Sequence, residues 1–265
     1  MKKLVLDIGA NSGLFSEYVL KNLENAIVVA FEPNPKFEPN FKTLLNDYEY
    51  RFNYEVKAVS NFTGSSEFHF TVDPSQQLSS LLKPNPLGLW DGYSKLFSIN
   101  DFKTSKVFTC DGKYIKQKYG GEVYLAKIDV QGSDISVARD LLSNLDVNFL
   151  IIEFQASSLQ NESVYVGQEN SLVDLSKLIT EFNLSTIKLF PNSANSVEFN
   201  VLLCKKNILS QFDLDFINVL IDSVVLKRFS EIIPIGDVPY SRLVRKFNRL
   251  LKSILLKIHF GNNRN

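Results

Sequence analysis

The sequence predicts an α/β fold with a doubly wound, mostly parallel sheet and helices on both of its faces. Buried apolar runs of strand length alternate with segments of helical spacing, and a glycine-bearing turn follows the first run. The 265 residues are 45% hydrophobic and 22% charged, as in ordinary globular proteins, and they contain no internal repeat. Strands that alternate with helices favour a parallel sheet.

The first half of the chain supplies four predicted strands and two helices. Leu4–Ile8 is an apolar run closed by Gly9, as expected of a strand buried on both faces. In the segment Glu67–Val72, apolar and polar residues alternate, which predicts a strand with one exposed face. The remaining elements are helix Gly13–Leu23, strand Ala26–Phe31, helix Pro35–Tyr48 and strand Arg51–Val59.

A long irregular stretch, Asp73–Asn100, interrupts this pattern and contains the only tryptophan, Trp90. Loops longer than about 15 residues are uncommon in compact domains, so we expect this stretch to be functional or mobile. Regular patterns then return as strand Glu122–Val130, helix Ser133–Leu142, strand Val147–Phe154, helix Leu172–Phe182, and strands Ser185–Phe190 and Val197–Cys204.

The chain after residue 206 changes character, and we divide it into a domain over 1–206 and a helical C-terminal extension over 207–265. From Ser241 to the end there are seven basic residues and no acidic one, and apolar residues fall on one helical face. Such a basic amphipathic helix can lie on an anionic membrane surface. The favoured alternative is that its apolar stripe packs on the domain itself or on a second copy of the chain, forming a homodimer.

Overall charge and cysteine content set the expected compartment. The 29 basic and 29 acidic residues cancel, which gives no indication of a nucleic-acid partner. The two cysteines, Cys110 and Cys204, lie in apolar stretches and are expected to be buried free thiols. The first apolar run is too short for a signal peptide. We therefore expect a cytoplasmic protein, with contact at the inner face of the membrane through the C-terminal helix as an option.

The most informative segment is LDIGANSG, residues 6–13, where a buried strand runs into a glycine turn and then a helix. In doubly wound folds this crossover places a ligand beside the carboxyl end of the first strand. Its Gly-x-x-x-Gly spacing differs from the pattern that cradles a dinucleotide pyrophosphate, which favours an adenosyl ligand without phosphates. Asp7 can receive a cation, and Glu32, at the end of the second strand, can accept hydrogen bonds from both ribose hydroxyls.

At this point the sequence resembles the FkbM family of S-adenosylmethionine-dependent methyltransferases. The similar segments follow the family order and cover roughly Leu4 to Gln155. They are LDIGANSG, VVAFEPNP, KAVSNFTGSSEFHF, the SSLL at 79–82, AKIDVQGSD and FLIIEFQ.

The resemblance implies a seven-stranded, Rossmann-like class I fold and methyl transfer to a hydroxyl of a sugar, glycolipid or related small molecule. The cofactor-binding residues predicted from the motifs together are Asp7, Gly9, Asn11, Gly13, Glu32, Pro33, Ala58 and Asp129. Two positions depart from the family pattern Asp-Val-Glu-Gly-x-Glu, which here has Gln131 and Asp134 in place of its two glutamates.

The predicted catalytic residues are two carboxylates at neighbouring strand ends. A hydroxyl acceptor must lose a proton during methyl transfer, so a general base or a metal is needed. Asp129 ends the strand Glu122–Val130 and is our candidate base, with Glu153 assisting. A divalent cation shared by both is an option that no His/Cys cluster supports, and we predict no metal ligand.

Two other functions remain open from the sequence. The same fold serves methyltransferases that act on RNA or protein, and the basic C-terminal segment keeps RNA in consideration. The second alternative is a scaffold that binds the cofactor without catalysis and acts on a membrane or a partner. The intact Asp7, Gly9, Glu32 and Asp129 argue against a decayed site.

Overall fold

A computed structural model of the chain describes residues 2–71, 78–85, 102–155, 164–191 and 198–205. The predicted C-terminal extension lies outside the described residues, as do Trp90 and most of the irregular stretch. The prediction of a basic amphipathic helix therefore stays a prediction.

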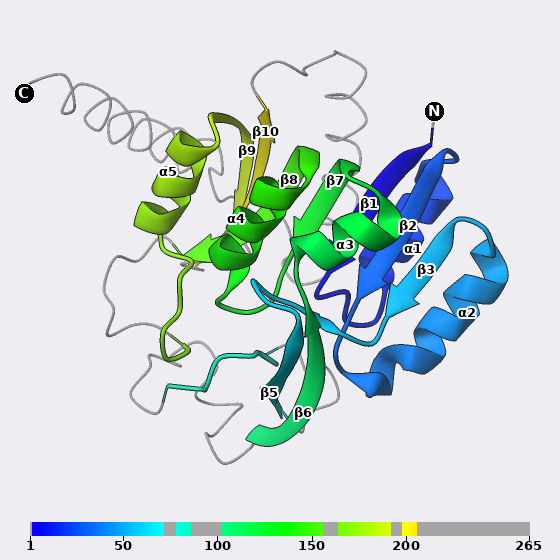
Figure 1. The fold of residues 1–265 in the computed structure, drawn as a ribbon, viewed down its shortest axis with the longest axis horizontal. Coiled ribbons are helices and arrows are strands. Elements are labelled where there is room, and N and C mark those ends of the chain that lie inside the picture. The colour runs from blue at the N-terminus through cyan, green and yellow to red at the C-terminus, as the bar shows by residue number, and fades with distance from the viewer. Residues whose placement is uncertain (1, 72–77, 86–101, 156–163, 192–197, 206–265) are drawn as a thin grey trace, which may run out of the picture. The chain divides into compact units, whose positions relative to one another are not determined.

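A seven-stranded sheet forms the centre of the described structure (Figure 1). Its strand order is β3-β2-β1-β7-β8-β10-β9, and only β10 runs against its neighbours. This confirms the predicted doubly wound, mostly parallel fold. The strands are β1 (Lys3–Ile8), β2 (Ala26–Phe31), β3 (Phe52–Glu55), β7 (Glu122–Ile128), β8 (Asp146–Gln155), β9 (Leu184–Pro191) and β10 (Glu198–Lys205).

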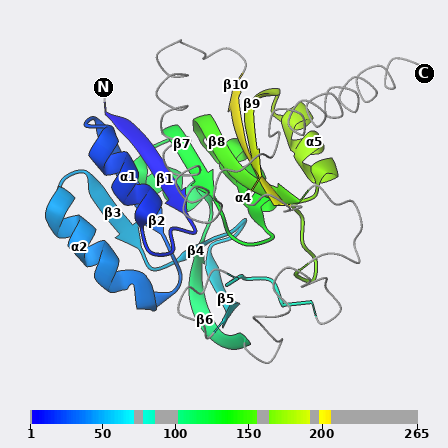
Figure 2. The ribbon, with the colours of Figure 1, turned by 180° about the vertical axis from the view of Figure 1, so that it is seen from behind.

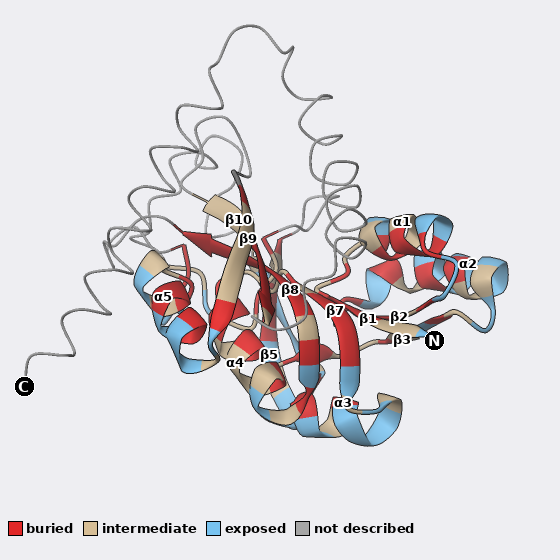
Figure 3. Ribbon diagram, turned by 90° about the horizontal axis from the view of Figure 1, so that it is seen from above, coloured by how far each residue is buried: buried red, intermediate tan, exposed pale blue. Residues whose placement is uncertain are grey.

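Helices cover both faces of this sheet, as predicted. Viewed from above, α1 and α2 lie on one side and α3, α4 and α5 on the other (Figure 3), and the reverse view has α1 and α2 in front (Figure 2). The interior strands are almost wholly buried because both of their faces pack under helices. No helix of the described part is long and apolar enough to cross a membrane. The helices are α1 (Leu14–Asn22), α2 (Glu38–Tyr48, after a 3-10 turn at Pro35–Phe37), α3 (Gly112–Tyr119), α4 (Asp134–Asn144) and α5 (Leu172–Glu181).

A second, three-stranded sheet lies beyond the carboxyl ends of the central strands (Figure 1). It consists of β4 (Ala58–Val59), β6 (Phe102–Cys110) and β5 (Gly64–Thr71), in that order. The single strand predicted over 51–59 is therefore wrong, because the chain leaves the central sheet after Glu55 and enters the small sheet at Ala58.

The prediction of an exposed face on β5 is also wrong at its carboxyl end. His69 is 7% exposed and Thr71 is fully buried. Ser80, in the segment 78–85, pairs with His69 through two backbone hydrogen bonds of 2.8 Å, so a further segment lies along the edge of β5 at this end. Cys110 and Cys204 are buried free thiols, as predicted.

Candidate functional site

The carboxyl ends of β1, β2 and β7 meet at the glycine turn that follows β1. Asp7 lies in register with Ala30 of β2 on one side and with Lys127 of β7 on the other. The amide of Ala10 donates to the carbonyl of Phe31 at 3.1 Å, and the amide of Asp129 donates to the carbonyl of Ile8 at 3.0 Å. The fold thus brings together the predicted residues Asp7, Gly9, Glu32 and Asp129.

Gly9 is the point of closest approach between the turn and the end of β7. Its φ of +72° is one that side-chain-bearing residues rarely adopt. A Cβ placed on Gly9 would lie 1.9 Å from the carbonyl oxygen of Asp129. The position therefore requires glycine for both its conformation and its space.

Asp7 is a fully buried carboxylate with one oxygen still available. Its Oδ2 accepts a hydrogen bond from Ser16 Oγ of α1 at 2.7 Å, whereas its Oδ1 is buried and accepts none. Burial raises the pKa of Asp7, although Lys127 and the bond from Ser16 act in the opposite direction. A buried carboxylate oxygen without a donor is costly, which makes Asp7 Oδ1 a candidate ligand atom.

Glu32 joins the glycine turn to the segment that follows β2. Its Oε2 accepts the amide of Asn11 at 2.9 Å and its Oε1 accepts the amide of Asn34 at 3.0 Å. Each carboxylate oxygen has two lone pairs, so each can still accept a ligand hydroxyl. Burial raises the pKa of Glu32 to about 7, even though the two backbone amides lower it.

The other predicted cofactor residues are placed differently. Asn11 belongs to the turn and adopts a φ of +49°. Gly13, with a φ of +83°, is packed closely by α2, because a Cβ there would meet Leu44 and Phe41 at 3.0 and 3.2 Å. Pro33 is buried beside Glu32, whereas Ala58 belongs to the small sheet, paired with Thr109.

The turn after β7 positions Asp129. Gln131 Nε2 donates to Asp129 Oδ1 at 2.9 Å, and Gln131 itself has a φ of +59°. Asp134, fully buried at the start of α4, accepts the amides of Val130 and Gly132, both at 2.9 Å. Burial, reinforced by the nearby Asp129, raises the pKa of Asp134 to about 7 despite these two amides. The two residues that depart from the family pattern thus hold the turn that presents Asp129.

Glu153 lies in β8, beside the end of β7. Ile128 of β7 is in register with Ile152 of β8, so Glu153 is level with Asp129. β8 continues to Gln155, so Glu153 lies within its strand and not at the end where the sequence placed it. Glu153 is 7% exposed and pairs across the sheet with Asn200 of β10. Within the described residues, no group of three or more His, Cys, Asp or Glu side chains is arranged to hold a metal ion.

Two further segments cover the turn after β7. Ser80, in the SSLL motif, donates from its hydroxyl to the carbonyl of Gln131 at 2.7 Å. Glu169 donates its amide to the carbonyl of Gly132 at 3.0 Å, and the Tyr165 ring is packed against Gly132. The SSLL and IDVQGSD motifs are therefore in direct contact, and this contact could not be read from their separation in sequence.

Sequence reasoning missed Lys127 altogether. Its Nζ donates to the carbonyl of Gly9 at 2.9 Å and lies 3.7 Å from Asp7 Oδ1 and 3.4 Å from Asp129 Oδ2. The signal available was a charged residue in an otherwise apolar strand, two positions before Asp129.

A sequence model described as the methyltransferase FkbM domain matches residues 7–186. The chain belongs to the FkbM methyltransferase family. The match spans the glycine turn, Glu32, the turn carrying Asp129 and the strand carrying Glu153. No curated protein matches the chain.

Two solved structures to which the chain is similar are described as methyltransferase proteins, and both are distant in sequence. Human methyltransferase-like protein 13 in complex with SAH has a TM-score of 0.43 and 11% identity over 91% of this chain and 86% of its own. An O-methyltransferase family 2 protein from Planctomyces limnophilus, in complex with apigenin, has a TM-score of 0.41 and 13% identity. That match covers 77% of this FkbM chain but only 51% of the family 2 protein, about half of its length.

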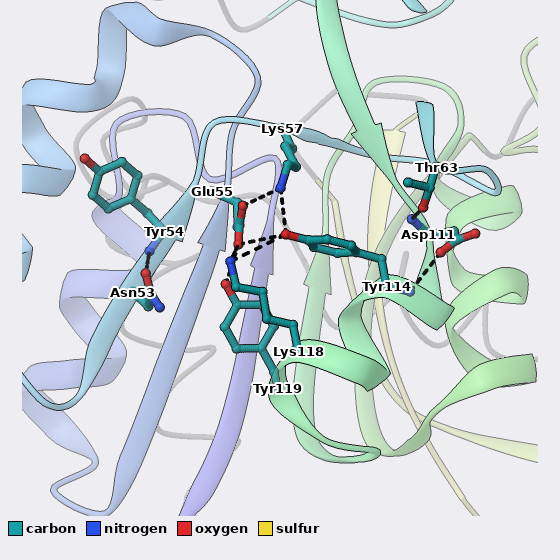
Figure 4. A network of polar contacts seen from close by, with 9 residues as sticks. All are labelled: Asn53, Tyr54, Glu55, Lys57, Thr63, Asp111, Tyr114, Lys118 and Tyr119. Atoms are coloured by element: carbon teal, nitrogen blue, oxygen red, sulfur yellow. Dashed lines mark hydrogen bonds and ion pairs between the residues drawn. The ribbon is translucent and has the colours of Figure 1, made fainter. Parts of the chain in front are cut away.

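A second polar cluster of this FkbM methyltransferase lies at the carboxyl end of β3 (Figure 4). Lys57 Nζ donates to Glu55 Oε2 at 2.8 Å, Tyr119 Oη donates to Oε1 at 2.7 Å, and Lys118 also contacts Oε1. Burial alone would raise the pKa of Glu55, but these hydrogen bonds outweigh it and lower the pKa to about 2. Because Lys118 and Tyr119 belong to α3, the cluster fastens that helix to the edge of the sheet.

We expect this cluster to make the stability of the FkbM domain depend on acidic pH. Because the pKa of Glu55 is lower in the folded chain, its contribution is complete above the unfolded value near 4.5 and is lost as pH falls toward 2. Glu55→Gln should therefore reduce the free energy of unfolding by about 1–2 kcal/mol at pH 7, discounted for the partly exposed lysines, and by progressively less below pH 4.5. Urea unfolding at a series of pH values measures both.

Asp146→Asn is the matched control, because Asp146 is 62% exposed and pairs with Lys205 at the surface. Its effect should stay below about 0.5 kcal/mol at every pH. If the loss of unfolding free energy in Glu55→Gln stayed the same at acidic pH, the ionised Glu55 carboxylate could not be the source of the stabilisation.

Proposed function

We propose that this chain is an S-adenosylmethionine-dependent O-methyltransferase whose acceptor is a hydroxyl group of a sugar, glycolipid or related small molecule. Membership of the FkbM family supports methyl transfer. The observation that carries the proposal is the close approach of Gly9 to the backbone carbonyl of Asp129, since it brings the residue that carries the candidate base to the turn that would hold the cofactor.

The residues around the glycine turn fit this cofactor. Glu32 keeps an acceptor lone pair on each oxygen for the two ribose hydroxyls. Asp7 Oδ1 is a buried acceptor without a donor, suited to an ammonium group. The absence of a side chain at Gly9 lets the turn lie directly against the end of β7, because the Asp129 carbonyl oxygen occupies the space of a Cβ.

When bound, S-adenosylmethionine supplies an electrophilic methyl group on a sulfonium. The chain has to orient the acceptor in line with that methyl group and take up the hydroxyl proton. Asp129 is suited to the proton transfer because Gln131 fixes one of its oxygens, Oδ1. Its other oxygen, Oδ2, is the one to which we assign the proton, and Glu153 on the neighbouring strand β8 is assigned to hold the acceptor hydroxyl.

Calorimetric titration with S-adenosylhomocysteine tests the cofactor assignment. We expect binding by the intact chain and a loss of about 10- to 100-fold in affinity for Glu32→Ala, because two buried hydroxyl contacts are removed. Glu122→Ala, an exposed glutamate at the amino end of β7, is the control and should bind normally. No binding by the intact chain would refute the proposal.

The same titration should depend on pH in a defined direction. Because the pKa of Glu32 lies at about 7 in the free chain, its carboxyl group is largely protonated at pH 6 and ionised at pH 8. The ionised form accepts both hydroxyls, so affinity should rise several-fold from pH 6 to pH 8. This rise should be absent in Glu32→Ala.

A further inference from the structure

The ammonium group of Lys127 lies near the carboxylates of both Asp7 and Asp129. Lys127 lies on β7 in register with Asp7 on β1, two residues before Asp129, so all three side chains share one face of the sheet. Its side chain is 17% exposed. Its ammonium group donates to the Gly9 carbonyl at 2.9 Å, which places a positive charge directly against the glycine turn.

Lys127 forms ion pairs with its two acidic neighbours, at distances longer than those of charge-assisted hydrogen bonds. Charge-assisted hydrogen bonds measure about 2.7–2.9 Å. Lys127 Nζ is 3.7 Å from Asp7 Oδ1 and 3.4 Å from Asp129 Oδ2. The ammonium group therefore lies at ion-pair distance from both carboxylates.

Asp7 provides a separate observation that points to a ligand. Its Oδ1, the oxygen that faces Lys127, is completely buried and accepts no hydrogen bond. A donor brought by a ligand would satisfy this oxygen. The same ligand would then meet the ammonium group of Lys127 within a few ångströms, so it must carry a negative group close to its positive one.

The amino-acid part of S-adenosylmethionine has this pattern, with an α-ammonium and an α-carboxylate on one carbon. We propose that Lys127 binds the α-carboxylate of the cofactor, while Asp7 Oδ1 accepts the α-ammonium. This inference rests on the proposed function. It adds Lys127 of β7 to the predicted cofactor-binding residues, and it assigns this lysine a role in recognising the amino-acid part rather than the nucleoside.

Cofactor fragments test the proposal without any methyl acceptor. The ligands are S-adenosylhomocysteine, which has the whole amino-acid part, and methylthioadenosine, which lacks it. For Lys127→Met we expect S-adenosylhomocysteine to bind at least 10-fold more weakly and methylthioadenosine to bind within about 2-fold of the intact chain. Lys21→Met, at an exposed ion pair with Glu17 on α1, is the control and should change neither.

The intact chain alone gives a second measurement, which holds even if Lys127→Met folds poorly. Decarboxylated S-adenosylmethionine should bind at least 10-fold more weakly than S-adenosylmethionine, because only the carboxylate is missing. Equal affinity for the two would overturn the proposal. So would a parallel loss of S-adenosylhomocysteine and methylthioadenosine in Lys127→Met, since Lys127 would then only shape the turn. Failure of the intact chain to bind any of these ligands would instead refute the proposed function itself.

Discussion

Replacing Gly9 with alanine is expected to lower the free energy of unfolding by about 3 kcal/mol or more and to abolish measurable cofactor binding. The new Cβ would lie 1.9 Å from the Asp129 carbonyl oxygen, and neither partner is a flexible side chain that can rotate away. The turn and the end of β7 must therefore separate, which displaces Asp7, Glu32 and Asp129 from one another. Urea unfolding and titration with S-adenosylhomocysteine measure the two effects.

Gly167→Ala separates the steric effect from backbone strain. Gly167 has a φ of +75°, nearly that of Gly9, but a Cβ there would meet nothing within 4 Å. Its substitution should cost only about 1 kcal/mol and leave binding intact. If the free energy of unfolding fell equally in the two variants, the clash with the Asp129 carbonyl would make no contribution to the effect of Gly9→Ala.

Replacing Asp129 with asparagine should reduce methyl transfer by about 100-fold or more while cofactor affinity stays within about 3-fold. Asparagine preserves the size of the side chain and an oxygen that can accept from Gln131, but it cannot take a proton from the acceptor. Glu153→Gln should have a smaller effect, because Glu153 is assigned to holding the hydroxyl. The assay is transfer of an isotope-labelled methyl group to a panel of glycans and glycolipids, read by mass spectrometry.

Asp146→Asn, at the amino end of β8, is the control for this experiment and should keep full activity. If the Asp129→Asn variant kept full activity, Asp129 could not be the base that takes the proton, and Glu153 would become the candidate base. Equal losses of turnover and cofactor affinity would indicate that Asp129 serves binding instead of the chemical step.

Much of the central sheet was predictable because its strands are buried on both faces. Runs such as Leu4–Ile8 and Ala26–Phe31 contain almost only apolar residues, and each is followed by a helix whose apolar spacing is clear. Gly9 and Glu32 were predictable from their places after the first and second strands. In each case a local pattern determined the structure, and no distant contact was needed to read it.

The small sheet was harder to predict because its strands have mixed surroundings. Residues 103–106 of β6 are exposed and polar, so the strand has no apolar run to mark it, and α3 was missed after it. His69 and Thr71 of β5 are polar yet buried. Their burial depends on segments that come later in the chain, and alternation within one strand carries no information about such a cover.

The roles of Lys127, Gln131 and Asp134 depend on atoms that only the folded chain brings together. Lys127 reaches the carbonyl of a residue 118 positions away. Gln131 and Asp134 are short-range partners of the Asp129 turn, but their hydrogen bonds require a left-handed conformation at Gln131 that its residue type does not suggest. Composition and spacing identify the carboxylates of the site but not the groups that orient them.

The position of β10 has a consequence for synthesis of the chain on the ribosome. The last described strand is an interior one, inserted between β8 and β9, which are already complete in sequence when it emerges. Until Lys205 has been translated, β8 presents an open edge along which β10 will pair with residues from Phe149 to Gln155. The nascent domain therefore carries an unpaired apolar edge until β10 has been made, and a chain ending at Pro191 would leave β9 without the strand that connects it to the sheet.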